Sequence, residues 1–154
     1  MALLTPGAVA KRLRQFIGPD AEDVPEKLAS LGDGDATVVP LDYAAHSIRL
    51  LATSPMERKW RARSCKKEPW TVEWIEETMS GGGVLYDVGA NVGTFSLVAA
   101  KVCGRRGTVV AFEPGFASYA HLCGNIVLNR CEAIIIPVPL AVAGTCGLGS
   151  FRYL

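Results

Sequence analysis

The sequence predicts an α/β protein in which helices flank a parallel sheet. From residue 84 onward, short apolar runs alternate with segments long enough for a helix. The first run, VLYDV at 84–88, leads directly into a turn that contains Gly89 and Gly93. A second run, VVAF at 109–112, ends at Glu113, about 20 residues beyond that turn, which leaves room for a helix and a return strand. Strands joined by helices pair in parallel through right-handed crossovers.

The alternation predicts three strands and two helices in the second half of the chain. We expect strands at 84–88, 108–113 and 134–139, with helices at 92–103 and 115–129. Such a βαβαβ unit is the core of a Rossmann-like sheet. We expect residues 81–154 to form this ligand-binding part and to be incomplete at the C-terminus, because the pattern stops soon after its third strand.

Residues 1–80 are expected to form a helical and hairpin region that leads into the sheet. Helical spacing of apolar residues occurs at 8–17 and again at 25–31. Two short apolar runs at 37–40 and 48–52 indicate a hairpin that packs beside the main domain.

Two more helices are expected before the first parallel strand. Ser54-Pro55-Met56-Glu57 has the pattern of a capping box with proline at the first helical position, and a basic helix follows as far as Arg63. The segment Glu68-Pro69-Trp70-Thr71 is expected to start the next helix, which runs from Val72 to Met79 and ends there because three glycines follow at 81–83.

Charge gives no indication of a nucleic-acid or membrane partner. The net charge is +1, from 16 Lys and Arg against 15 Asp and Glu. The basic clusters at 11–14 and 58–63 are expected to be solvated helix faces. The uncharged stretch at 133–149 contains Pro137 and Pro139, so we expect a buried strand and a loop there, not a membrane span.

The cysteines and histidines predict neither disulfides nor a metal site. Five cysteines occur, an odd number, without a CxxC spacing, and the two histidines have no ligand-spaced neighbours. No secretory signal pattern is found at the N-terminus. We therefore expect reduced thiols and a cytoplasmic location.

The turn between the first strand and its helix has the residues of a nucleotide site. Gly89 lets the chain leave the strand sharply, and Gly93 is expected to let the helix sit close to the sheet. Free backbone N–H groups at the start of that helix are expected to face a crevice. Asp87 and Glu113 end adjacent strands, at the edge where open parallel sheets bind ligands. Glu113 has enough acceptor sites for two vicinal ribose hydroxyls.

Two nucleotide ligands compete for this turn. A dinucleotide fingerprint that starts at Gly89 would need glycines in place of Asn91 and Thr94. The pattern Asp-x-Gly-x-Asn-x-Gly suits S-adenosylmethionine better, because its sulfonium and ammonium groups are cationic and attract the carboxylate of Asp87. A nicotinamide-dependent oxidoreductase remains as a less favoured alternative.

The motif residues also resemble a known family. DVGANVGTFSLVAA at 87–100 and VVAFEPGFASYAHLCGNIVLN at 109–129 resemble the FkbM family of class I, S-adenosylmethionine-dependent methyltransferases, and the similarity extends from about Glu68 to Ala141. The resemblance implies an O-methyltransferase for a small-molecule hydroxyl or carboxyl acceptor. It implies these cofactor-binding residues: Asp87, Gly89, Ala90, Asn91, Gly93, Glu113, Glu68, Thr71 and Ala141. Asn125 and Asn129 are expected to tie their helix to its surroundings.

The sequence also departs from that family. Members continue into a fourth strand and further strands that build the acceptor pocket, whereas this sequence has none of these. We expect an open edge on the first strand, which would favour self-association or a covering partner. A cofactor-binding or protein-interaction module without catalysis is thus a second hypothesis. Residues 1–154 alone are expected to transfer no methyl group, and we assign no catalytic base and no metal.

Overall fold

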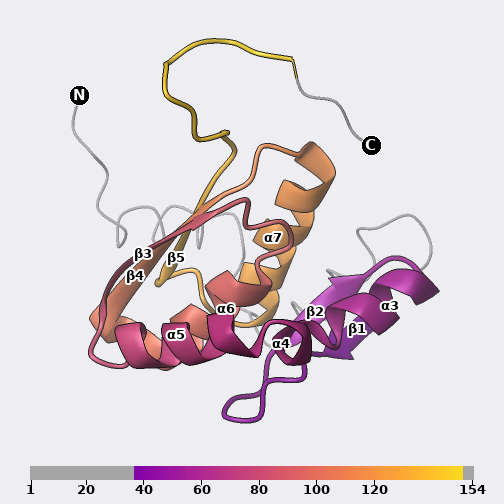
Figure 1. The fold of residues 1–154 in the computed structure, drawn as a ribbon. Helices are drawn as coiled ribbons and strands as arrows, with labels where there is room; N and C mark the ends of the chain where they lie inside the picture. Colours follow the sequence, from indigo (N-terminus) through magenta and orange to yellow (C-terminus); the bar gives the residue numbers. More distant parts are fainter. Residues whose placement is uncertain (1–36, 151–154) are drawn as a thin grey trace, which may run out of the picture.

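The structure, a computed structural model, describes residues 37–150. The helices expected at 8–17 and 25–31 lie outside the described residues. In chain order the elements are β1 (Thr37–Pro40), β2 (Arg49–Ala52), α3 (Pro55–Arg61), α4 (Ser64–Lys67), α5 (Pro69–Met79), β3 (Gly83–Val88), α6 (Thr94–Cys103), the 3-10 turn η1 (Gly104–Arg106), β4 (Gly107–Phe112), α7 (Phe116–Leu128) and β5 (Ile135–Val138). Figure 1 shows how they are arranged.

Strands β3, β4 and β5 form a parallel sheet in that order, as the sequence predicts. Each strand lies within two residues of its expected position. Strand β3 pairs only with β4 among the described strands, so one edge of the sheet is open there, as expected. Helix α6 begins at Thr94, two residues later than expected, because Asn91 and Gly93 take positive φ angles of 52° and 83°.

The two faces of this sheet differ sharply. Leu85, Val109 and Ile135 lie side by side in the register and are buried, as is Ala111 on the same face. They join the core that α5, α6 and α7 complete. On the opposite face, residues of β3 remain exposed: Val84 by 59%, Tyr86 by 67% and Val88 by 60%. The ring of Tyr86 stacks on that of Phe112, with centroids 6.2 Å apart.

Strands β1 and β2 form the expected antiparallel hairpin, and two asparagines tie it to α7. Asn125 Oδ1 accepts a hydrogen bond from the Leu51 N–H at 2.7 Å, and its Nδ2 donates to the Val92 carbonyl at 2.9 Å. Asn129 Oδ1 accepts from the Arg49 N–H at 2.8 Å, and its Nδ2 donates to the Arg49 carbonyl at 2.6 Å. Both side chains are therefore structural ties, as the sequence predicts.

Helix α3 starts as expected at the cap residue Ser54, whose Oγ accepts from the Glu57 N–H at 3.1 Å. The Glu57 carboxylate does not return to the cap residue itself. Its Oε2 accepts from the N–H and the hydroxyl of Thr53, at 2.8 and 2.7 Å. The sequence does not predict the following short helix, α4. Helix α5 begins at Pro69, inside the segment expected to start it, and ends at Met79 as expected.

Among residues 37–150, no helix has both the length and the apolar character that a membrane crossing requires. The same residues contain no group of three or more His, Cys, Asp or Glu side chains that could hold a metal ion.

Candidate functional site

The turn from β3 to α6 is held by backbone hydrogen bonds to the next strand. The N–H groups of Gly89 and Ala90 both donate to the Phe112 carbonyl at 2.9 Å, and the Gly93 N–H donates to the Ala90 carbonyl at 2.8 Å. These N–H groups of the turn are therefore already used in hydrogen bonds within the protein. The expectation of free N–H groups therefore applies only to the first turn of α6 itself, whose bonds start at Leu97.

The two glycines of the turn are required for different reasons. Gly89 has a φ of +80°, yet a Cβ there would meet nothing within 4 Å, so its requirement is conformational. Gly93 has a φ of +83°, and a Cβ there would lie 2.5 Å from Cδ1 of Leu122 in α7. The close approach at Gly93 is thus to α7, and the expectation that it serves the contact with the sheet is wrong.

Glu113 connects the turn to the loop after β4. Its side chain is buried, with 8% of the residue exposed. Oε2 accepts from the Asn91 N–H at 2.8 Å, and Oε1 accepts from the Gly115 N–H at 2.7 Å. A carboxylate has about four acceptor positions, so two of them remain after these bonds.

Asp87 lies at the end of β3 and is held by Ser96 of α6. The Ser96 hydroxyl, which is fully buried, donates to Asp87 Oδ2 at 2.5 Å. Burial raises the pKa of Asp87 above its usual range, the Ser96 hydrogen bonds lower it, and the negative charge of Glu113 adds to the rise. Sequence analysis missed the role of Ser96, although a serine in the first turn of an apolar helix was a signal for it.

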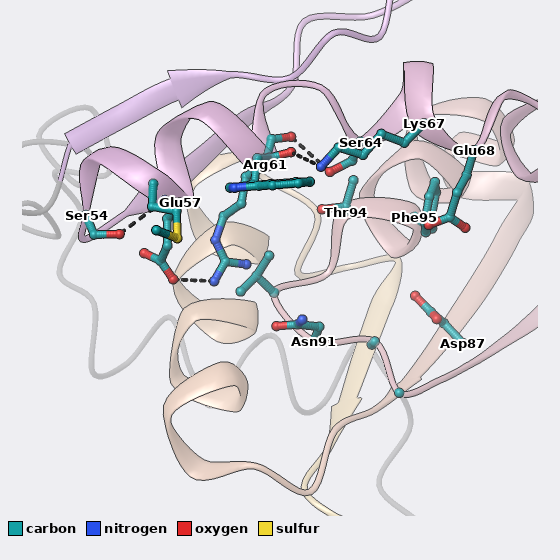
Figure 2. Close-up of a pocket in the computed structure, with 15 residues that line it drawn as sticks. Ser54, Glu57, Arg61, Ser64, Lys67, Glu68, Asp87, Asn91, Thr94 and Phe95 are labelled. Carbon is teal, nitrogen blue, oxygen red and sulfur yellow. Dashed lines mark hydrogen bonds and ion pairs between the residues drawn. The ribbon is translucent and has the colours of Figure 1, made fainter. Parts of the chain in front are cut away.

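A pocket of about 530 Å³ separates this turn from α3 and α4 (Figure 2). It brings together five of the predicted site residues. They are Asp87, Gly89, Ala90, Asn91 and Glu68. The other four do not line it: Gly93 and Glu113 support the turn from behind, Thr71 donates to Glu68 Oε2 at 3.4 Å, and Ala141 lies in the exposed segment after β5.

The facing wall carries Arg61, which the sequence places in a basic cluster expected to be a solvated helix face. Arg61 is only 17% exposed in its side chain, and its Nη2 pairs with Glu57 Oε1 at 2.5 Å. Arg61 Nε is the one buried side-chain nitrogen or oxygen that finds no partner among the described residues. Leaving a buried donor unpaired costs on the order of 1–3 kcal/mol. Arg61 therefore lines the pocket and has one N–H group that no described residue pairs with.

Two further contacts fix the residues around Arg61. Burial raises the pKa of Glu57, but its hydrogen bonds from Arg61 and Thr53 outweigh burial and lower the pKa from 4.5 to about 2. Glu57 is therefore ionised at neutral pH and fixes the guanidinium. Lys67 Nζ lies 3.8 Å from the ring centroid of Trp60 and donates to the Trp60 carbonyl at 3.2 Å. This wall is built by contacts within α3 and α4.

The site and its fold can now be compared with known proteins. No protein-family model matches the sequence. The hexuronic acid methyltransferase AglP of Haloferax volcanii is 30% identical over 97 residues, which are 63% of this chain and 38% of AglP. The chain thus spans less than half the length of this relative.

Solved structures are similar over about the same share of the chain. TYW2 of M. jannaschii, solved in complex with AdoMet, is 22% identical with a TM-score of 0.51, and the match covers 71% of this chain and 45% of TYW2. A SAM-dependent methyltransferase from Agrobacterium tumefaciens is 19% identical with a TM-score of 0.48, over 70% of this chain and 33% of that protein. The likeness to TYW2 establishes the predicted fold class: residues 37–150 contain a three-stranded parallel sheet with flanking helices, which is part of the α/β methyltransferase fold.

Proposed function

We propose that this chain is the cofactor-binding part of an S-adenosylmethionine-dependent methyltransferase that methylates an oxygen of a small-molecule acceptor. The observation that carries the proposal is the pocket between the 89–92 turn and α3–α4, with the Asp87 carboxylate at its edge. The similarity to AglP supports the reaction class. The narrower assignment to the FkbM family rests on the motif residues.

The residues of the pocket fit this cofactor. Asp87 would face the cationic methionyl end, and the turn from Gly89 to Gly93 would lie along it. Glu113 would bind the ribose through the acceptor positions that Asn91 and Gly115 do not use. Glu68 and Thr71 would close over the cofactor, and Ala141 would lie near the adenine.

When bound, the cofactor would supply an electrophilic methyl group on its sulfonium for transfer to an acceptor oxygen, with S-adenosylhomocysteine as the leaving group. The protein's contribution is to hold the two reactants in line, and such positioning can lower the barrier by about 7–11 kcal/mol. An acceptor hydroxyl also needs a base. Of the two histidines, His46 is exposed in the hairpin loop and His121 lies in α7, and neither lines the pocket. We assign no base to the described residues.

The acceptor that we propose is a sugar acid or a similar hydroxylated carboxylate. This rests on AglP, whose name gives a hexuronic acid as its substrate. Either a hydroxyl or the carboxylate of such a molecule would accept the methyl group.

Calorimetry with three ligands tests the cofactor assignment. We expect S-adenosylmethionine and S-adenosylhomocysteine to bind in preference to NAD, because the turn lacks the glycine that a pyrophosphate needs at Asn91. Equal or tighter binding of NAD would reject the methyltransferase assignment and favour an oxidoreductase.

We also propose a second candidate function, a protein-interaction module without catalysis. The exposed apolar residues of β3 and its open edge support it, because unpaired strand edges and apolar patches bind other chains.

A further inference from the structure

The pocket carries opposite charges on its two sides. Asp87 and Glu68 lie together at one end of it, while Arg61 extends from α3 toward the turn that carries Asn91 (Figure 2). A ligand that enters between them meets a carboxylate at one end and a guanidinium at the other. This arrangement complements a molecule that carries both an ammonium and a carboxylate group.

Neighbouring residues hold the Arg61 guanidinium in a fixed position. Glu57 fixes one side of the guanidinium through Nη2, and Glu57 is itself fixed by two hydrogen bonds from Thr53. The guanidinium has five N–H donors, and its buried Nε has no partner among the described residues. A planar guanidinium held in this way binds carboxylates through two parallel hydrogen bonds.

Lys67 adds a second positive charge to the same wall. Its ammonium group is held over the ring of Trp60 and by the Trp60 carbonyl, so it stays on the pocket side of α4. Glu57 neutralises one charge of this wall, and the lysine restores a net positive charge. Of the charged side chains of α3 and α4 that line the pocket, two are therefore positive and one is negative.

We propose that Arg61, assisted by Lys67, binds a carboxylate in this pocket. The inference rests on the proposed function, which provides two carriers of that group. One is the α-carboxylate of the cofactor's methionyl end, whose ammonium would then face Asp87. The other is the carboxylate of a sugar-acid acceptor. In both cases Arg61 binds the ligand directly. The exposed basic residues of α3 that do not line the pocket have no part in binding.

The test compares ligands that differ in the carboxylate, using the full 154-residue chain and calorimetry. S-Adenosylhomocysteine carries the α-carboxylate, whereas 5′-methylthioadenosine lacks the amino-acid end. D-Glucuronate and D-glucose form the matching pair for the acceptor. The variants are Arg61→Gln and Arg61→Lys. Lys59→Gln is the control, because Lys59 is exposed on the same helix, outside the pocket, and loses the same charge.

If the cofactor supplies the carboxylate, Arg61→Gln weakens the binding of S-adenosylhomocysteine roughly tenfold to a hundredfold and changes the binding of 5′-methylthioadenosine by less than about twofold. Arg61→Lys restores part of the affinity, and Lys59→Gln changes neither ligand. If the acceptor supplies the carboxylate, Arg61→Gln leaves the affinity for both adenosine ligands unchanged and abolishes the preference for D-glucuronate over D-glucose. Thermal unfolding of each variant shows whether the fold is retained.

Two results would overturn the inference. One is an equal loss for S-adenosylhomocysteine and 5′-methylthioadenosine, which would make Arg61 a structural residue. The other is no change for any ligand in Arg61→Gln. If the wild-type chain binds neither adenosine ligand, the proposed function fails, and the D-glucuronate arm alone then decides whether the wall binds carboxylates.

Discussion

Glu113 ties together the two loops that border the proposed cofactor site. Replacing it with Ala leaves the N–H groups of Asn91 and Gly115 without this acceptor, and the buried donor at Gly115 alone costs about 1–3 kcal/mol. We therefore expect Glu113→Ala to lower the free energy of unfolding. We also expect this substitution to weaken the binding of S-adenosylhomocysteine roughly tenfold to a hundredfold, because a hydrogen bond from a ribose hydroxyl to a carboxylate contributes about 1.5–3 kcal/mol.

Glu113→Gln serves as the graded variant, since its amide keeps one acceptor oxygen and should have a smaller effect on both quantities. Thermal unfolding and calorimetry measure them separately. Lower stability with unchanged ligand affinity would show that Glu113 only joins the loops and does not bind ribose.

Single residues of the site differ in how far the sequence predicts them. Asp87 and Glu113 are predictable, because the ends of neighbouring parallel strands meet at one edge. The two bonds of Glu113 to backbone N–H groups are not, since they depend on the path of the turn. Arg61 is missed because a run of basic residues does not indicate which member faces inward before the helix is packed.

Gly93 controls how closely the start of α6 approaches α7. We expect Gly93→Ala to be more destabilising than Gly89→Ala. Both substitutions put a Cβ on a left-handed backbone, which costs about 1–2 kcal/mol, but only at Gly93 does the new carbon also meet Leu122, at 2.5 Å. Thermal unfolding of the two variants gives the comparison.

Leu122→Val provides the control for this contact, because it removes the δ carbons that a Cβ at Gly93 would meet. In that background, adding Gly93→Ala should cost less than it does in the wild type. Equal costs in the two backgrounds would show that backbone strain alone explains the requirement for glycine.

The helices and strands are predicted more reliably than the joins between them. The regular alternation after residue 84 places β3, β4 and β5 within two residues, and the apolar runs of β3 and β4 are bounded by glycine or polar residues. The four-residue helix α4 is too short to show a helical period. The late start of α6 depends on the positive φ of Asn91, which an asparagine permits but does not dictate.

In the described part of the chain, helices cover one face of the parallel sheet, whereas the other face is exposed at β3. Helices α6 and α7 cover the face with Leu85 and Val109, while the residues of β3 that point the other way stay exposed. The sequence predicts the open edge from the number of strands. It does not predict that the apolar opposite face stays exposed, because a strand buried on both faces has apolar residues on both as well.

This open strand leads to the prediction that the isolated chain associates with itself. We expect light scattering to give a mass well above the 16.4 kDa of one chain, because the unpaired edge and the exposed Tyr86 and Val88 offer both hydrogen bonds and apolar surface. Tyr86→Lys and Val88→Lys should shift the mass toward the monomer, since a charged lysine on an edge strand opposes pairing. Trp70→Lys is the control, because Trp70 is a similarly exposed aromatic residue, at 66%, that belongs to helix α5 and not to the open strand. A monomeric wild type, or an equal shift in the control, would show that β3 is not the association surface.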